Sequence, residues 1–295
     1  MSPVALWSVL GPASIVAAAL LLIALERAFP YTPDRRLWRA GIGTDLMGYA
    51  ILQSVVVGWV IARIIAGLDG LSGMSRLHLI SGWPVWGQVL LFLVTHDLYI
   101  YLFHRLQHRV PLLWRIHEAH HATADVDWLS GSRSHALEIL INQTIEFAPI
   151  VLLGAAPEVP LIKTTLDAVW GMYIHANIDV RSGRLQYFLN GPEMHRWHHA
   201  REITTGVNFG TKLAVWDWLF GTAHRPAGKP RAYGLSSFFP GGYLAQQAFA
   251  FRRPSAHANA AGRISSAVER QVISPSTATR PRLRMPWLWA RNKAR

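Results

Sequence analysis

The stretch ALWSVLGPASIVAAALLLIAL at residues 5–25 contains no charged side chain. It is about as long as the roughly 20 residues that a helix needs to cross the hydrocarbon layer of a bilayer. A secretory signal peptide is the alternative, because the stretch is N-terminal and rich in alanine. No Lys or Arg precedes it, as a signal peptide would require. We therefore predict a first transmembrane helix here.

Four further apolar stretches predict an all-α, polytopic membrane protein. They cover residues 45–67, 84–103, 136–153 and 159–178. The last three carry polar side chains, which are costly at membrane depth unless they pair inside a helical bundle or line a site. The GAAP sequence at 154–157 has room only for a tight hairpin. We predict about four to five transmembrane helices with a helical cap on the cytoplasmic side.

The amino-acid composition limits the kinds of catalytic and metal sites that the chain can contain. The chain has 295 residues, 51% of them apolar, and no cysteine. The missing thiols exclude structural disulfides, cysteine nucleophiles, cysteine-held iron–sulfur clusters and Cys-type zinc sites. Any metal must therefore be held by His or carboxylate. The formal charge of +12 is explained by basic loops and a basic tail, so we expect no nucleic-acid partner.

The positions of the arginines predict an orientation. Arginines follow the first, third and fifth apolar stretches, whereas only Arg76 lies between the second and third and none lies in the hairpin. By the positive-inside rule the N-terminus faces outward, and both long polar insertions lie on the cytoplasmic side.

Three histidine-rich motifs stand in these polar insertions: HRLQH at 104–108, HEAHH at 117–121 and HRWHH at 195–199. Positions i, i+3 and i+4 share one face of a helix, so the histidines of each motif point the same way. Eight imidazoles exceed the four ligands of a structural zinc site, and the count fits two metal ions. Imidazole suits iron, copper, nickel and zinc alike, so ligand type leaves the metal open.

Other residues are candidates for the same site. His175 is a ninth candidate ligand, and His135 is a candidate for supporting a ligand or for a structural role. Asp97 lies seven residues before His104, which makes it the best-spaced carboxylate to balance the metal charge. Spacing does not rank the carboxylates nearer the motifs, which are Glu118, Asp125, Asp127, Glu138, Asp179 and Glu193. For four isolated histidines we expect no metal role: His78, His96, His224 and His257.

Residues from about 85 to 225 resemble the fatty acid hydroxylase superfamily, also called the sterol desaturase family. The resemblance rests on HDLYIYLFHRLQH (96–108), WRIHEAHH (114–121), SRSHALE (132–138), MYIHANI (172–178), NGPEMHRWHH (190–199), NFGT (208–211) and WDWLFGT (216–222). It implies an integral-membrane non-haem di-iron oxygenase that uses O2 and two electrons to hydroxylate, desaturate or oxidatively cleave a lipid, sterol or carotenoid. The implied iron ligands are His104, His108, His117, His120, His121, His175, His195, His198 and His199. Gly171 stands where related enzymes have one more histidine.

This resemblance also predicts a division of the chain and a partner. Residues 1–82 would form N-terminal transmembrane helices, 83–250 the catalytic domain and 251–295 a basic, disordered tail. The sequence has no Gly-rich dinucleotide motif and no cysteine for a cluster, so electrons must come from elsewhere. A separate reductase with a ferredoxin or a b5-type cytochrome is the hypothesis for their source. A docking face for an acidic carrier could include Arg181, Arg184, Arg196, Arg201, Lys212, Arg225 and Lys229. These cations could equally contact lipid headgroups.

One alternative of another class remains. His117, Glu118 and His121 match H-E-x-x-H, the zinc metalloprotease motif in which the glutamate is the general base. An intramembrane protease would leave the other histidine motifs unexplained, because HRWHH has Arg196 in place of the glutamate.

Overall fold

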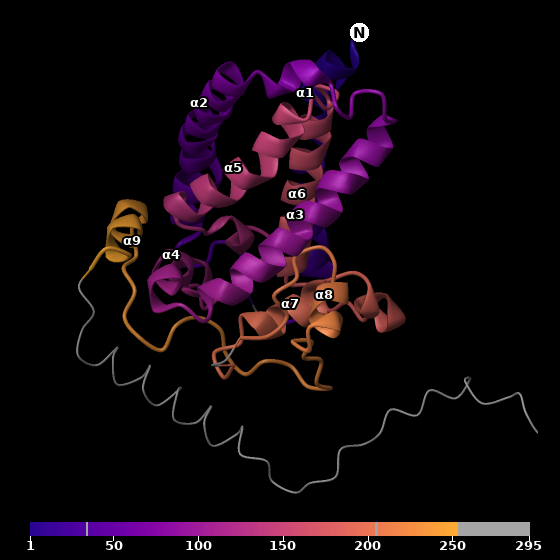
Figure 1. Ribbon diagram of the computed structural model, residues 1–295. Helices are drawn as coiled ribbons and strands as arrows, with labels where there is room; N and C mark the ends of the chain where they lie inside the picture. Colours follow the sequence, from indigo (N-terminus) through magenta and orange to yellow (C-terminus); the bar gives the residue numbers. More distant parts are fainter. Residues whose placement is uncertain (34, 204–205, 253–295) are drawn as a thin grey trace, which may run out of the picture. The chain divides into compact units, whose positions relative to one another are not determined.

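The computed structural model describes residues 1–33, 35–203 and 206–252, and this part of the chain is helical (Figure 1). The predicted disorder of the tail beyond residue 252 and the expectation for His257 lie outside the described residues. The longer helices are α1 (Pro3–Ala28), α2 (Ser54–Ser72), α3 (Val85–Gln107), α4 (Pro111–His121), α5 (Ala136–Leu152) and α6 (Val159–His175). The shorter elements are η1 (Thr44–Gln53), η2 (Met74–Leu77), η3 (Ser130–Ser132), η4 (Gly183–Tyr187), α7 (Pro192–His198), α8 (Val215–Leu219) and α9 (Tyr243–Phe249).

Among the described residues, three helical segments are long and apolar enough to cross a membrane: α1, the continuous η1–α2 segment and α3. Large apolar side chains such as Leu20, Val55 and Trp59 remain exposed on them, as expected for helices that contact lipid. The predicted all-α membrane protein is therefore confirmed. Helices α5 and α6 have 17 residues each, about 25 Å, and fall short of the length of a typical span.

Proline and glycine set several helix boundaries. Prolines occupy the first turns of α4, α6 and α7, where their missing N–H groups cost no hydrogen bond. Gly154 begins the hairpin between α5 and α6 with a φ of +68°. A Cβ atom at Gly154 would lie 2.8 Å from the carbonyl oxygen of Ser75, so the close approach of these two turns requires glycine. The hairpin predicted at 154–157 is confirmed.

The bundle is arranged around α5 and α6. Figure 1 shows these two helices between α2 and α3, while α4, α7 and α8 gather at the end of the bundle far from the N-terminus. Helix α1 packs on α6, and α2 packs on α5. Apolar contacts between these helices include Leu22 of α1 against Ala176, and Ile61 and Ile65 of α2 against Ala148.

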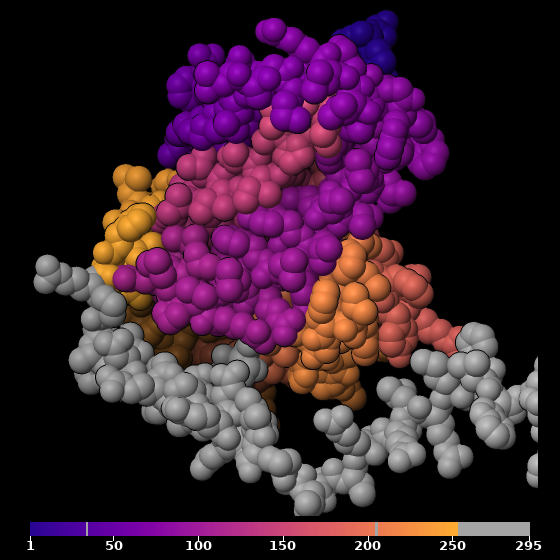
Figure 2. All heavy atoms as spheres, viewed as in Figure 1, coloured from indigo at the N-terminus to yellow at the C-terminus, as the bar shows by residue number. Residues whose placement is uncertain are grey.

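The segment around α8 packs against the side of α3 (Figure 2). The Phe220 ring stacks on Tyr101 with centroids 5.3 Å apart. The Asp97 carboxylate accepts hydrogen bonds from the backbone N–H groups of Lys212 and Leu213, both at 2.9 Å. These contacts attach the 208–222 segment to α3 and so hold it beside the histidine motifs.

Candidate metal centre

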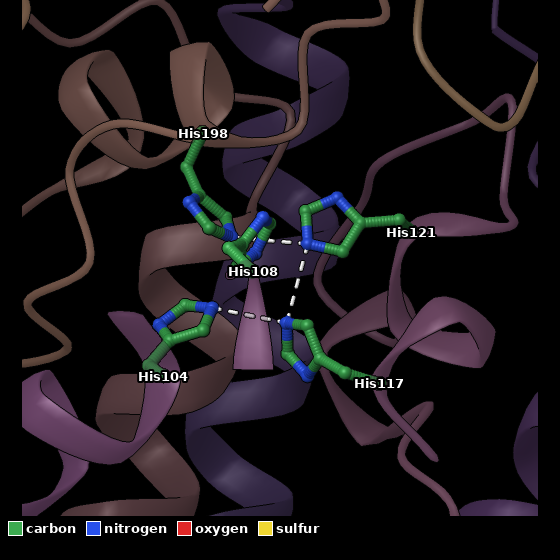
Figure 3. Close-up of side chains that lie close together, drawn as sticks. All are labelled: His104, His108, His117, His121 and His198. Carbon is green, nitrogen blue, oxygen red and sulfur yellow. Dashed lines mark hydrogen bonds between the residues drawn. The ribbon is translucent and has the colours of Figure 1, made fainter. Parts of the chain in front are cut away.

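The structure brings the nine histidines singled out above into two groups. The five-histidine cluster comprises His104, His108, His117, His121 and His198, and the four-histidine cluster comprises His120, His175, His195 and His199. Within each cluster, one ring nitrogen from every residue lies within 4.8 Å of the others. Figure 3 shows the rings of the five-histidine cluster converging on one point.

Two helices contribute to both clusters. On α4, His117 and His121 join the five-histidine cluster, while His120 joins the four-histidine cluster. The HRWHH motif at α7 divides in the same way, since His198 belongs to one cluster and His195 to the other. Helices α4 and α7 thus each carry histidines of both clusters. The two candidate ion positions are therefore adjacent.

Hydrogen bonds fix which nitrogen carries the proton in most of these rings. The Nδ1 atoms of His104, His120 and His198 lie 2.9, 2.8 and 2.7 Å from backbone carbonyl oxygens. The Nδ1 atom of His117 lies 2.9 Å from a carboxylate oxygen of Glu138. Oxygens of both kinds only accept, so these Nδ1 atoms must donate. The Nε2 atom of each neutral ring is then left with a free lone pair.

The free lone pairs face one another. In the five-histidine cluster the Nε2 atoms of His117 and His104 are 3.0 Å apart. In the four-histidine cluster the Nδ1 atom of His175 donates to the carbonyl oxygen of Gly171 at 2.7 Å, and the Nε2 atoms of His175 and His120 are 3.3 Å apart. Lone pairs this close repel unless a cation lies between them. Ligands at right angles around an ion about 2.1 Å away would be about 3.0 Å apart, so the spacing fits bound metal.

Burial keeps these rings neutral. Desolvation, with neighbouring imidazoles, holds the pKa values of His121, His198 and His199 well below the usual range. A neutral imidazole with a free Nε2 atom is the form that binds a metal ion.

Comparison with known proteins agrees with this geometry. Residues 89–222 match the family model described as fatty acid hydroxylase. This segment is similar to fatty acid hydroxylases, and we call residues 89–222 the hydroxylase domain. No solved structure gives a significant match.

Three relatives illustrate the match. The chain is 36% identical over 174 residues to the ornithine lipid hydroxylase OlsE of Rhizobium tropici, covering 58% of this chain and 52% of the relative. It is 30% identical over 141 residues to alkylglycerol monooxygenase of Homo sapiens, covering 48% of this chain and 31% of the relative. It is 30% identical over 131 residues to methylsterol monooxygenase 1 of Rattus norvegicus, covering 44% of each chain. The matched part thus spans about half or less of each of these relatives.

Glu138 is the carboxylate of the hydroxylase domain that reaches the histidines. It is buried, and its Oε1 atom accepts from His117 and, at 2.9 Å, from the side-chain amide of Gln107. The expectation that Asp97 would take this place was wrong. Its oxygens bind the backbone of residues 212 and 213 and the side chains of Thr211 and Trp216, and they contact no histidine in the described part of the chain.

His135 was predicted either to support a metal ligand or to have a structural role, and the structure shows the structural role. It is the N-cap of α5, where its Nδ1 atom accepts from the Leu137 N–H at 3.1 Å. Its Nε2 atom lies 2.9 Å from the carbonyl oxygen of Gln247. His135 therefore fixes the start of the helix that carries Glu138, and among the described residues it contacts none of the nine clustered histidines.

Two glycines position His175 in the hydroxylase domain. The Gly171 carbonyl accepts from the His175 Nδ1 atom at 2.7 Å. A Cβ atom at Gly131 would lie 2.6 Å from that Nδ1 atom, so only glycine fits there. Sequence reasoning noted Gly171 only as a missing histidine and did not identify Gly131.

Arg196 lies inside the hydroxylase domain and cannot belong to a docking face. It is fully buried, and its guanidinium lies 4.6 Å from the ring centroid of Tyr31 and 4.9 Å from that of Tyr233. It also donates to the carbonyl oxygen of Val126 at 3.0 Å. Lys212 is buried as well, so two of the seven proposed docking cations are corrected; the exposed ones are Arg181, Arg184, Arg201, Arg225 and Lys229.

The metalloprotease alternative lacks its general base. The Glu118 carboxylate is buried and accepts two hydrogen bonds from Arg252, at 2.6 and 3.3 Å. His117 and His121 belong to a cluster of five imidazoles rather than to a three-ligand zinc site with an open position. The geometry therefore disfavours peptide hydrolysis.

Proposed function

We propose that this protein is a membrane-bound di-iron oxygenase that uses O2 and two electrons to hydroxylate or desaturate a lipid or sterol-like substrate. The observation that carries the proposal is the pair of adjacent histidine clusters with unprotonated Nε2 atoms turned inward. The nine clustered histidines would hold the two iron ions, five around one and four around the other. The names of the three relatives, which refer to ornithine lipids, alkylglycerols and methylsterols, support a lipid substrate.

When bound, the iron pair supplies the activation of O2 needed to oxidise an unactivated C–H bond. The protein residues supply position and charge. Backbone carbonyl oxygens and Glu138 fix the ring orientations through the Nδ1 atoms, and the Glu138 carboxylate offsets part of the metal charge.

A cavity of about 210 Å³ beside the clusters would hold the substrate. Its wall includes His104, His117, His120, His175 and His195. Apolar side chains of Ile100, Phe103, Ile139 and Ile174 line it next to these rings. Such a wall binds a hydrocarbon segment and keeps bulk water from the reacting carbon.

The orientation and the electron donor belong to the same proposal. The arginine distribution supports a cytoplasmic position for the histidine clusters and an external N-terminus. An external ferredoxin, or a b5-type cytochrome with its reductase, would supply the electrons. The five exposed cations, from Arg181 to Lys229, would form the face for such an acidic carrier.

The test is lipid profiling under ¹⁸O2 of cells that express the wild-type chain or His198→Ala. We expect the wild type to produce an oxygenated or desaturated lipid and His198→Ala to produce none at equal protein levels. His78→Asn is the matched control, because His78 is exposed, lies far from the clusters in sequence and has a φ of +49° that asparagine tolerates. Identical lipid profiles for wild type and His198→Ala would overturn the proposed function.

A further inference from the structure

The cavity has a second polar region, deeper in the helical bundle than the histidines. His96 of α3, Glu146 of α5, Lys163 and Asp167 of α6 and Lys212 gather there, and we call them the ion-pair cluster. The Lys163 ammonium contacts a Glu146 carboxylate oxygen, lies 2.5 Å from Asp167 and lies 3.3 Å from the Nδ1 atom of His96. Lys212 pairs with the other Asp167 oxygen at 2.6 Å. His96 was expected to have no role in the site, and it belongs instead to this cluster.

The ion-pair cluster and the histidine clusters line the same cavity. They are separated by the same number of residues on three helices. The cavity wall includes His96, Glu146, Asp167 and Lys212 together with five of the clustered histidines. On α3, α5 and α6 the two regions are eight residues apart, as the pairs His96/His104, Glu146/Glu138 and Asp167/His175 show. Eight residues of α-helix rise about 12 Å, which is the distance between the two regions along the helices.

The ion-pair cluster is not a third metal site. His96, Glu146 and Asp167 could by distance hold a cation together. The ammonium of Lys163 already contacts all three, and its three N–H groups are used by them. Two cations and two carboxylates balance, so the cluster needs no further ion.

Two polar ring nitrogens that line this cavity have no hydrogen-bond partner among the described residues. The Nδ1 atom of His96 lies 3.3 Å from the Lys163 ammonium and 3.3 Å from the Oε1 atom of Glu146. Since an ammonium can only donate, we infer that Nδ1 accepts from Lys163 and that the proton of the neutral ring lies on Nε2. That Nε2 atom and the indole Nε1 atom of Trp170 are buried and have no hydrogen-bond partner among the described residues. Both residues line the cavity. Buried donors without partners are costly, so a bound group with acceptor oxygens would stabilise this region.

From these contacts we propose that the ion-pair end of the cavity binds an uncharged, oxygen-bearing group of the lipid substrate, such as an amide, an ester or a hydroxyl. An anion would face Glu146 and Asp167, and a cation would face Lys163 and Lys212, whereas a neutral acceptor fits the balanced charges. His96 lies eight residues before His104 on α3, and Trp170 lies five residues before His175 on α6. The oxidised carbon would then lie roughly 7 to 12 Å from that oxygen along the helices, which makes the substrate a lipid modified near a polar group. This inference rests on the proposed function.

The test measures binding of two radiolabelled probes, dodecanamide and dodecane, to the purified, iron-loaded full chain in detergent without O2. Trp170→Phe removes one unpartnered donor and breaks no hydrogen bond within the described residues. We expect it to weaken dodecanamide binding about fivefold, the effect of one neutral hydrogen bond, and to leave dodecane binding unchanged within about twofold. Trp86→Phe is the matched control, because Trp86 is 72% exposed on α3, and it should change neither affinity.

Two results would overturn the inference. One is an equal effect of Trp170→Phe on both probes, including no effect on either. The other is tighter binding of charged dodecanoate or dodecylammonium than of dodecanamide. Iron content and ¹⁸O incorporation into lipid are measured on the same preparations. Iron-loaded, active protein without the probe preference contradicts this inference alone, whereas protein without iron or lipid oxidation contradicts the proposed function.

Discussion

The two polar regions of one cavity differ in what lies at their centres. At the histidine clusters, hydrogen bonds hold the protons of His104, His117, His120 and His175 on their Nδ1 atoms, and the unprotonated Nε2 atoms of these rings face one another in pairs 3.0 and 3.3 Å apart. At the ion-pair cluster, three groups with similar mutual distances surround the ammonium of Lys163. Both arrangements group potential metal ligands, but only in the second does a side chain of the protein supply the cation that the ligand atoms surround. A grouping of ligand atoms therefore indicates a metal site only when no cationic side chain lies among them.

The largest expected effect comes from removing a lone pair from a histidine cluster. His121→Ala should abolish lipid oxidation, by more than about 100-fold, because loss of a ligand should exceed the 10- to 100-fold effects of residues that only support ligands. The metal-free protein should unfold at a slightly lower temperature than the metal-free wild type, because truncating a buried ring leaves a cavity. Activity assays and thermal unfolding in detergent measure both quantities, with His78→Asn as control. Retained activity would show that His121 is not a ligand.

The ion-pair cluster should respond mainly in the stability of the protein. Lys163→Met leaves Glu146 buried without its counter-ion and should lower the free energy of unfolding by about 3–5 kcal/mol. Adding Glu146→Gln should restore a large part of this loss, because the unpaired charge disappears while Lys212 still pairs with Asp167. Chemical unfolding of the single and double variants in detergent measures the difference. Equal stability of Lys163→Met and wild type would contradict a buried ion pair here.

A smaller effect is expected at Glu138, where charge and hydrogen bonding can be separated. Glu138→Gln keeps an acceptor oxygen for His117 but removes the negative charge, and it should weaken iron binding about 10- to 100-fold. Glu202→Gln, at an exposed position, is the control. Iron affinity measured by competition with a chelator tests this, and an unchanged affinity would show that the Glu138 charge does not stabilise the metal.

The smallest effect is expected at His135, which supports the fold rather than the metal. His135→Ala removes the N-cap of α5 and should destabilise the protein by about 1 kcal/mol without lowering iron content. Thermal unfolding and metal analysis on one preparation distinguish the outcomes. A loss of iron with unchanged stability would assign His135 to the metal centre instead.

The sequence predicted the apolar helices and the grouping of the histidines because both depend on local periodicity. A run such as residues 5–25 needs no tertiary information to be identified as a span. The pattern in HEAHH shows which rings share a face of α4. Even so, the pattern did not predict that His120 and His121 serve different clusters, because that division depends on where α6 and α7 lie around α4.

Contacts between helices were not predictable from spacing within one helix. Asp97 shares a face with His104 but points to the 211–216 segment, and the carboxylate that reaches His117 comes from α5 as Glu138. The ion-pair cluster was missed for the same reason, since Lys163, Glu146 and His96 come from three helices. The sequence did contain one indication of the ion-pair cluster. A polar residue lies eight positions from a residue of the metal centre in each of the pairs 96/104, 138/146 and 167/175.

The most direct test of the account is the number and kind of metal ions in the purified protein. Elemental analysis of the full chain, expressed with iron and purified without chelators, should give about two iron ions per chain and little zinc. Removing both His198 and His199, one from each cluster, should bring the iron content close to zero with the helical content unchanged. One zinc ion per chain, or an iron content that this double substitution does not change, would contradict the central claim that the two histidine clusters hold an iron pair.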